Sequence, residues 1–249
     1  MPDAHARSTP LTGKCISSGR RPGFRGDVSR PDSAPGRPLI LVFPSAVAIE
    51  AASTALKGRP DISVGAQDVH WEPKGAFTGE TSIQLAKGAG ATGALVGHSE
   101  RRHVFGETDA ETRRKVRALL EAGLTPMLCV GETLAERVAQ QTESVVTRQL
   151  REGLHNLSPA DLARVLIAYE PVWAIGAGKN ATPEDAAEVH RAVRGVVAEL
   201  GLGGRATVLY GGSVNKGNVQ ALVAQDEIDG VLVGGASLDP EGWSELVQL

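Results

Sequence analysis

From Leu39 onward the chain alternates short apolar runs with amphipathic segments, and this alternation limits the possible folds more than any other feature. The runs are four to six residues long and rich in β-branched side chains, which is typical of buried strands. Segments of helical period follow each run and end at glycine or proline. We expect strands at 39–43, 62–66, 91–96, 125–130, 165–169, 206–210 and 228–233, and helices at 46–56, 83–87, 110–121, 143–154, 183–200, 218–224 and 243–247. Strict alternation predicts one α/β domain with a parallel sheet.

A closed barrel needs eight strands, whereas an open doubly wound sheet does not, and composition leaves this choice open. Polar residues that could take part in catalysis or binding follow most of the expected strands. Because all such loops converge at one end of a closed cylinder, their distribution favours the (β/α)8 barrel over the open sheet.

Residues 1–37 differ in kind from the rest of the chain. Their prolines, glycines and arginines interrupt any helical pattern, so we expect an irregular segment with one possible strand at 11–17. The domain prediction is therefore an atypical segment at 1–37 and a barrel domain at 38–249. The first strand would be weak or displaced and the first helix missing. A replaced or mistranslated N-terminus is one hypothesis for this change in amino-acid composition, and the other reading frames of the coding DNA would test it.

Charge and cysteine content limit the possible partners. The formal net charge of −3 argues against nucleic-acid or membrane-surface partners, and no apolar run is long enough to span a bilayer. The two cysteines, Cys15 and Cys129, and the six histidines form no metal-binding spacing. These features predict a cytoplasmic protein without a bound metal.

The segment 166–179 is the first candidate for a functional site. Its apolar strand ends at Tyr169, Glu170 follows at the carboxyl tip, and Pro171 prevents the strand from continuing. An aperiodic apolar stretch then runs to the glycines at 176 and 178, as in a loop that closes over a reaction. The alternative is a structural loop whose glutamate caps the next helix.

His98 follows another expected strand. Ser99 is a suitable N-cap and Glu100 suits a first helical turn, which places His98 just before a helix N-terminus. The positive end of the helix dipole disfavours imidazolium, so a neutral ring able to donate a hydrogen bond is expected. An ordinary histidine beside a helix cap is equally compatible with this hexapeptide.

Glycine pairs follow the last two expected strands, at Gly211–Gly212 and Gly234–Gly235. Glycines in this position let backbone N–H groups approach a phosphate. The same region commonly binds phosphate in α/β barrels, although glycine also serves plain turns.

Six segments in order resemble the triosephosphate isomerase family: 75–80, 97–102, 128–133, 168–176, 210–213 and 232–237. The resemblance covers about residues 38–249. It implies cofactor-free interconversion of dihydroxyacetone phosphate and D-glyceraldehyde 3-phosphate through an enediolate, a step of glycolysis and gluconeogenesis.

The resemblance also implies roles for individual residues. Glu170 matches the catalytic base and His98 the neutral electrophile, with Ser99 and Glu100 in support. The segment 171–179 matches the closing lid, with Ala177 where the family usually has threonine. The backbone donors to phosphate are matched by Gly176, Ser213, Gly234 and Gly235.

A homodimer is expected because the loop 67–80 resembles the family's interface loop, with Phe77 and Thr78 near its tip. Such a long loop is unusual on a free surface.

The family's first-strand Asn-x-Lys motif is absent. Lys14 lies 30 positions before Pro44, about the family's usual separation, so it either replaces the catalytic lysine or is an ordinary solvated side chain. The alternative function is therefore a catalytically impaired phosphate-binding barrel. A different phosphate-binding barrel, such as an aldolase, would need a Schiff-base lysine on a strand.

Overall fold

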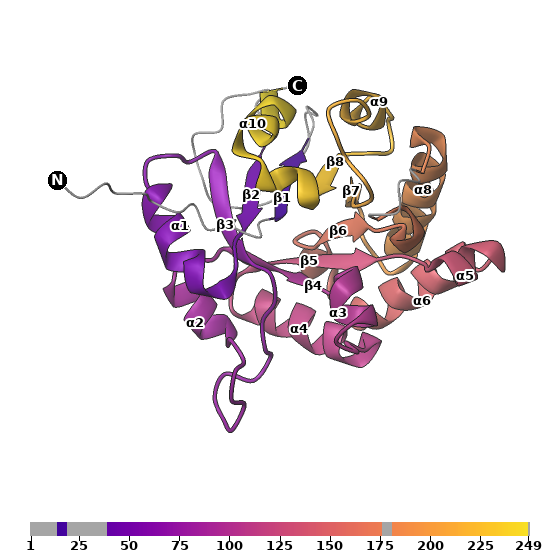
Figure 1. Ribbon diagram of the computed structural model, residues 1–249. Helices are drawn as coiled ribbons and strands as arrows, with labels where there is room; N and C mark the ends of the chain where they lie inside the picture. Colours follow the sequence, from indigo (N-terminus) through magenta and orange to yellow (C-terminus); the bar gives the residue numbers. More distant parts are fainter. Residues whose placement is uncertain (1–13, 19–38, 176–180, 249) are drawn as a thin grey trace.

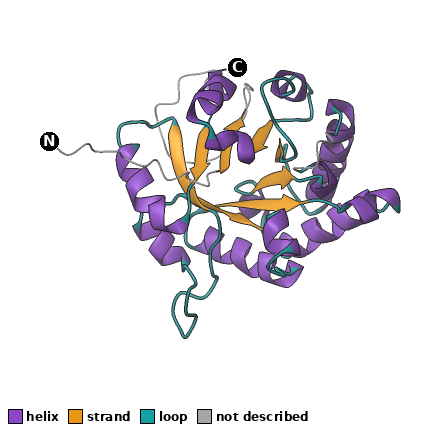
Figure 2. Cartoon of the chain, viewed as in Figure 1, coloured by secondary structure: helices purple, strands orange, loops and turns teal. Residues whose placement is uncertain are grey.

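The structure, a computed structural model, describes residues 14–18, 39–175 and 181–248. Eight strands close into a barrel in chain order, surrounded by helices (Figures 1 and 2). The strands are β1 (Lys14–Ser18), β2 (Ile40–Phe43), β3 (Ile62–Ala66), β4 (Gly93–Val96), β5 (Thr125–Val130), β6 (Leu166–Tyr169), β7 (Thr207–Tyr210) and β8 (Gly230–Val233). The predicted (β/α) barrel is confirmed, and the expected bounds of β3 and β5 match the observed ones.

The helices of the described chain cover the outside of the barrel. They are α1 (Ile49–Ala55), α2 (Ile83–Gly88), α3 (Ser99–His103), α4 (Asp109–Glu121), α5 (Leu134–Val138), α6 (Thr142–Gly153), α7 (Pro159–Leu162), α8 (Pro183–Glu199), α9 (Val219–Val223) and α10 (Pro240–Gln248), with 3-10 turns η1 (Ala46–Ala48), η2 (Val172–Ala174) and η3 (Gly235–Leu238). The short helices α5 and α7 were not expected from the sequence. None of the described helices has the length and apolar character needed to cross a membrane.

The first strand runs against the others. Strands β2 to β8 pair in parallel, whereas β1 pairs antiparallel with both β2 and β8. β1 thus occupies both edges that would be open without it. The parallel pairing expected for the seven strands from residue 39 onward is confirmed. The first strand, expected to be weak or displaced, is antiparallel to its neighbours. A parallel neighbour needs a crossover, usually a helix, and the sequence 19–37 predicts none, whereas an antiparallel strand needs no crossover.

Of the N-terminal segment, the structure describes only residues 14–18. The expected strand 11–17 is observed as Lys14–Ser18, and residues 11–13 lie outside the described part of the chain. So does 19–38, where the first helix was expected to be missing. The domain boundary at residue 38 stays a prediction.

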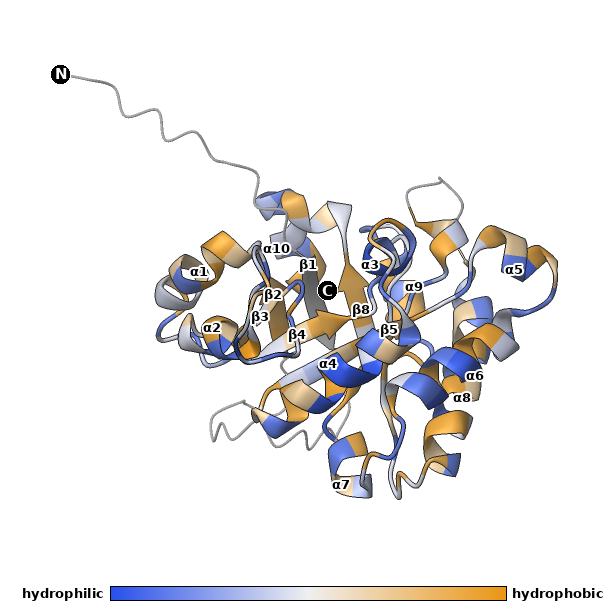
Figure 3. Ribbon diagram, turned by 90° about the horizontal axis from the view of Figure 1, so that it is seen from below, coloured by the Kyte–Doolittle hydropathy of each residue, from blue (hydrophilic) through white to orange (hydrophobic). Residues whose placement is uncertain are grey.

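The core has two layers, set by the alternation of side chains along each strand. One cluster fills the barrel interior and includes Leu41, Phe43, Met127 and Leu232. A larger cluster lies between the strands and the helices, for example at Leu119, Leu150 and Val193. Figure 3 shows the corresponding colouring, with apolar strands inside and polar helix faces outside.

Candidate active site

Glu170 lies at the carboxyl end of the barrel, directly after β6. Its N–H donates to the carbonyl of Val130 at 2.7 Å, which continues the β5–β6 pairing by one bond. Pro171 then ends the strand and η2 begins. The Glu170 side chain is almost entirely buried, with 2% of the residue exposed. A buried carboxylate needs hydrogen-bond donors, and neighbouring loops supply them.

His98 lies beside Glu170, with 2.8 Å between its Nε2 atom and Glu170 Oε1. The N–H of Glu100 donates to His98 Nδ1 at 3.2 Å. Because Nδ1 accepts this hydrogen bond, the ring proton is on Nε2 and the imidazole is neutral. The side chain of His98 is therefore the N-cap of α3, so the expectation that Ser99 is the N-cap was wrong.

Ser99 instead binds the carboxylate. Its N–H donates to Glu170 Oε2 at 2.8 Å, and its hydroxyl lies 3.4 Å from Glu170 Oε1. The tips of β4 and β6 thus hold a carboxylate and a neutral imidazole in direct contact. This pair can accept a proton at one oxygen and donate a hydrogen bond from Nε2 to a nearby substrate atom.

A cavity of about 570 Å³ opens above this pair. The loops after β7 and β8 also line it, and a Cβ atom added at Gly234 or Gly235 would meet nothing within 4 Å. Backbone at these glycines therefore faces open space. The described lining residues are Gln67, His98, Glu100, Glu170, Ile175, Gly211, Gly212, Ser213, Val214, Asn215, Leu232, Gly234, Gly235, Ala236 and Leu238.

The start of the expected lid is anchored to the barrel by Glu132, which is fully buried after β5. Its carboxylate accepts hydrogen bonds from Trp173 Nε1 at 2.8 Å and from the Tyr169 hydroxyl at 3.1 Å. Burial, with the Glu132 charge beside it, raises the pKa of Tyr169. The Ser213 hydroxyl also donates to the carbonyl of Ala174 at 2.6 Å. The rest of the lid, including Gly176 and Ala177, lies outside the described residues.

Lys14 is the first residue of β1, opposite Phe43, the last residue of β2. Reversal of β1 therefore puts the Lys14 backbone at the carboxyl end of the barrel. The cavity-lining Gln67 donates to the carbonyl of Phe43 at 2.9 Å, so this register position lies near the cavity. Of the described residues that line the cavity, none is a lysine or an arginine.

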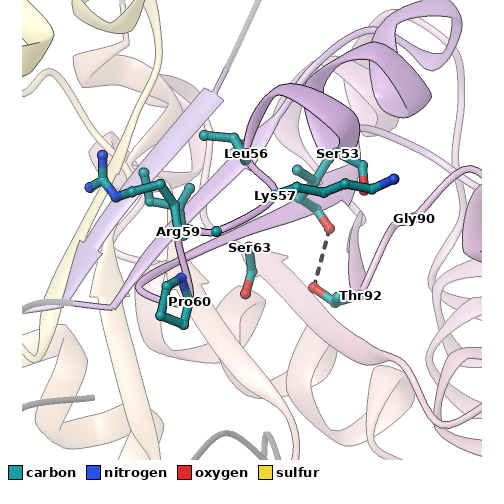
Figure 4. Close-up of a pocket in the computed structure, with 11 residues that line it drawn as sticks. Ser53, Leu56, Lys57, Arg59, Pro60, Ser63, Gly90 and Thr92 are labelled. Carbon is teal, nitrogen blue, oxygen red and sulfur yellow. Dashed lines mark hydrogen bonds between the residues drawn. The ribbon is translucent and has the colours of Figure 1, made fainter. Parts of the chain in front are cut away.

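A second cavity, of about 320 Å³, lies near the amino ends of β3 and β4, where Lys57 and Arg59 extend in different directions (Figure 4). The described residues around it include no carboxylate and no imidazole. Arg59 pairs with Asp61 at 2.6 Å. Because its described lining offers neither a carboxylate nor an imidazole, the usual general bases, and because it lies at the end of the barrel that usually serves stability, this cavity is not the candidate active site.

In the described part of the chain, no group of three or more His, Cys, Asp or Glu residues could hold a metal ion. Sequence reasoning missed Glu132 as the anchor of the first part of the expected lid. Glu132 had a detectable signal, since it follows an expected strand.

Comparison with known proteins agrees with this geometry. A sequence model of the family described as "Triosephosphate isomerase" matches residues 28–249. Triosephosphate isomerase of Solibacter usitatus is 48% identical over 212 residues, which cover 84% of each chain. That of Bdellovibrio bacteriovorus is 48% identical over 211 residues, covering 84% of this chain and 86% of its own. That of Trichlorobacter lovleyi is 46% identical over 212 residues, covering 84% of each chain. The chain belongs to the triosephosphate isomerase family.

Proposed function

We propose that this isomerase interconverts dihydroxyacetone phosphate and D-glyceraldehyde 3-phosphate in glycolysis and gluconeogenesis, with Glu170 as the base and His98 as the electrophile. Glu170 would remove a proton from one carbon of the substrate and return it to the neighbouring carbon. The Nε2–H of His98 would donate to the carbonyl oxygen as negative charge develops there. The reaction as proposed uses no cofactor.

The contact between Glu170 and His98 at the floor of a cavity is the observation that carries this proposal. The substrate would displace the Glu170–His98 hydrogen bond and take over the Nε2–H donor. A neutral imidazole suits this task because its Nε2–H can donate a hydrogen bond to the carbonyl oxygen although the ring carries no positive charge. Ser99 and Glu100 support the pair by holding the carboxylate and the ring.

The phosphate would lie against the loops after β7 and β8, held by backbone N–H groups of Gly176, Ser213, Gly234 and Gly235. The Ser213 hydroxyl already donates to Ala174, so its N–H is the group proposed to bind phosphate. Oriented N–H groups favour a dianion without bringing a mobile counterion into the site.

Lys14 is proposed to supply the positive charge that the described lining residues lack. Its register position at the carboxyl end of the barrel supports this role. A cation that meets both phosphate and oxyanion contributes several kcal/mol to transition-state stabilisation, so its loss would lower the rate by orders of magnitude.

A coupled assay tests the proposal. Formation of glyceraldehyde 3-phosphate from dihydroxyacetone phosphate is followed by NAD reduction with excess glyceraldehyde-3-phosphate dehydrogenase. The wild-type protein should show turnover, and Lys14→Ala should lose at least about 100-fold in kcat/KM. Equal rates would remove Lys14 from the mechanism. Absence of turnover in the wild type, with phosphate binding retained, would support the impaired-barrel alternative.

A homodimer is also proposed, in the cytoplasm. The loop between β3 and α2 projects away from the barrel (Figure 1), and its Phe77 and Thr78 are exposed. Phe77 is 43% exposed although it is a large apolar side chain, and it packs only partly, on the His70 ring at 4.3 Å. Sedimentation velocity should show a dimer in the wild type and a larger monomer fraction in Phe77→Asp.

A further inference from the structure

The Gln149 side chain makes two hydrogen bonds to a single residue, Gly131. Gly131 N–H donates to Gln149 Oε1 at 2.7 Å, and Gln149 Nε2 donates to the Gly131 carbonyl at 3.1 Å. Gln149 lies on α6 with only 4% of the residue exposed. Its amide thus makes the pair of bonds that a neighbouring strand would make to a strand residue.

Gly131 needs these bonds because it lies just past the end of β5. The β5–β6 register ends at Val130 opposite Tyr169, and one further bond joins Glu170 N–H to the Val130 carbonyl. Beyond this point the buried peptide groups of Gly131 have no strand partner in the described sheet. Gln149 supplies both missing partners from the helix layer.

The backbone of Gly131 is in contact with the backbone of Glu170. A Cβ atom built on Gly131 would lie 1.8 Å from the Glu170 carbonyl oxygen and 2.6 Å from its carbonyl carbon. Val130 and Gly131 therefore contact the main chain of Glu170 on both its N–H and its carbonyl side. Because the two backbones are in contact, a displacement of Gly131 would also displace the backbone of Glu170.

We propose that Gln149 is a positioning residue for the isomerisation: by fixing Gly131, it fixes the backbone from which the Glu170 carboxylate reaches the substrate. The inference rests on the proposed function. Gln149 does not line the described cavity and would not contact substrate. Since a shift of about 1 Å in a reacting group can cost about 100-fold in rate, loss of the amide is expected to lower kcat about 10- to 100-fold.

Two substitutions separate positioning from general stability. Gln149→Met keeps the length of the side chain and removes both bonds to Gly131. Gln149→Glu removes the donor when ionised but restores it when protonated, because a carboxylic acid can accept from the N–H and donate to the carbonyl. Burial raises the pKa of a carboxyl group, so protonation should occur within an accessible pH range.

The matched control is Leu150→Ala, on the same helix. Leu150 is fully buried in the outer core cluster. Its truncation should lower the melting temperature at least as much as Gln149→Met, while kcat well below that temperature stays within about twofold of wild type.

The experiment measures kcat, KM and competitive inhibition by inorganic phosphate between pH 6 and pH 9. Gln149→Met should lose kcat at nearly unchanged KM and phosphate inhibition constant. The kcat of Gln149→Glu, as a ratio to wild type, should rise at least about fivefold from pH 9 to pH 6. Wild-type kcat in Gln149→Met, or a pH-independent ratio for Gln149→Glu, would overturn the inference while leaving the proposed function intact. An inactive wild type would refute the proposed function and this inference with it.

Discussion

Replacement of Gly131 by alanine tests how closely the end of β5 controls the catalytic carboxylate. The added Cβ atom would lie 1.8 Å from the Glu170 carbonyl oxygen, where separations below 3.0 Å essentially never occur, so the two backbones must separate by more than 1 Å. Both atoms belong to structured main chain, so no flexible side chain can absorb the shift. A displacement of this size predicts a loss of about 100-fold in kcat.

The same substitution should also reduce stability. Overpacking of this kind costs about 1–3 kcal/mol, and in a chain of this size each kcal/mol lowers the melting temperature by about 2–4 °C. The protein should therefore fold, with a melting temperature reduced by about 2–12 °C. Steady-state kinetics at 25 °C and thermal unfolding by circular dichroism provide the two measurements.

Gly195→Ala is the matched control for this substitution. Gly195 lies within α8, and a Cβ atom there would meet nothing within 4 Å. Alanine in a helix interior is favoured over glycine by about 0.5–1 kcal/mol, so this variant should be slightly more stable and fully active. Wild-type kcat in Gly131→Ala, with the protein folded, would refute the claim that the tip of β5 positions Glu170.

Three other predictions concern single side chains, the first of them His190 in α8. Burial lowers the pKa of His190 to about 4, so the unfolded chain binds more protons below pH 6.5 and the free energy of unfolding should fall between pH 6.5 and pH 4, by about 3 kcal/mol from this group. Denaturant titrations give the free energy of unfolding at each pH in that range. Its decrease from pH 6.5 to pH 4 should be smaller for His190→Phe than for wild type, and an equal decrease would contradict this. Glu132→Gln keeps the volume but weakens the acceptor for Tyr169 and Trp173, and it should lower stability by about 1–3 kcal/mol in thermal unfolding; an unchanged melting temperature would count against the anchor. Ser213→Ala removes the bond to the Ala174 carbonyl and should cost about 0.5–1.5 kcal/mol, again by thermal unfolding, with no effect expected if that bond is absent in solution.

The strands were largely predictable because each is a short apolar run between turn residues. Thr125–Val130 is an example, with Gly123 before it and Gly131 after it. The helix α5 was missed although Thr133 and Glu136 form a capping box, because five residues are too few to show a helical period. The direction of β1 could not be predicted, since hydrophobic pattern specifies a strand but not the strand it runs beside or which way it runs.

The residues at strand tips were easier to predict than the residues that position them. Glu170 directly follows β6 and His98 is the second residue after β4, so the fold alone brings them to one end of the barrel. Gln149 acts on Gly131 across 18 positions of sequence, and their contact depends on how α6 packs against the sheet. The sequence pattern contains no signal for which residues of α6 face the end of β5.

The most direct test of the account is proton transfer by Glu170. Dihydroxyacetone phosphate is incubated in D₂O with wild type or Glu170→Gln, and deuterium on the product carbon is measured by mass spectrometry. Wild type should convert the substrate and introduce solvent deuterium. Glu170→Gln should lose about 1,000-fold in both, because a positioned general base contributes about 100- to 10,000-fold, and inorganic phosphate should still inhibit its residual turnover. Comparable conversion by the two proteins would contradict the assignment of Glu170 as the base.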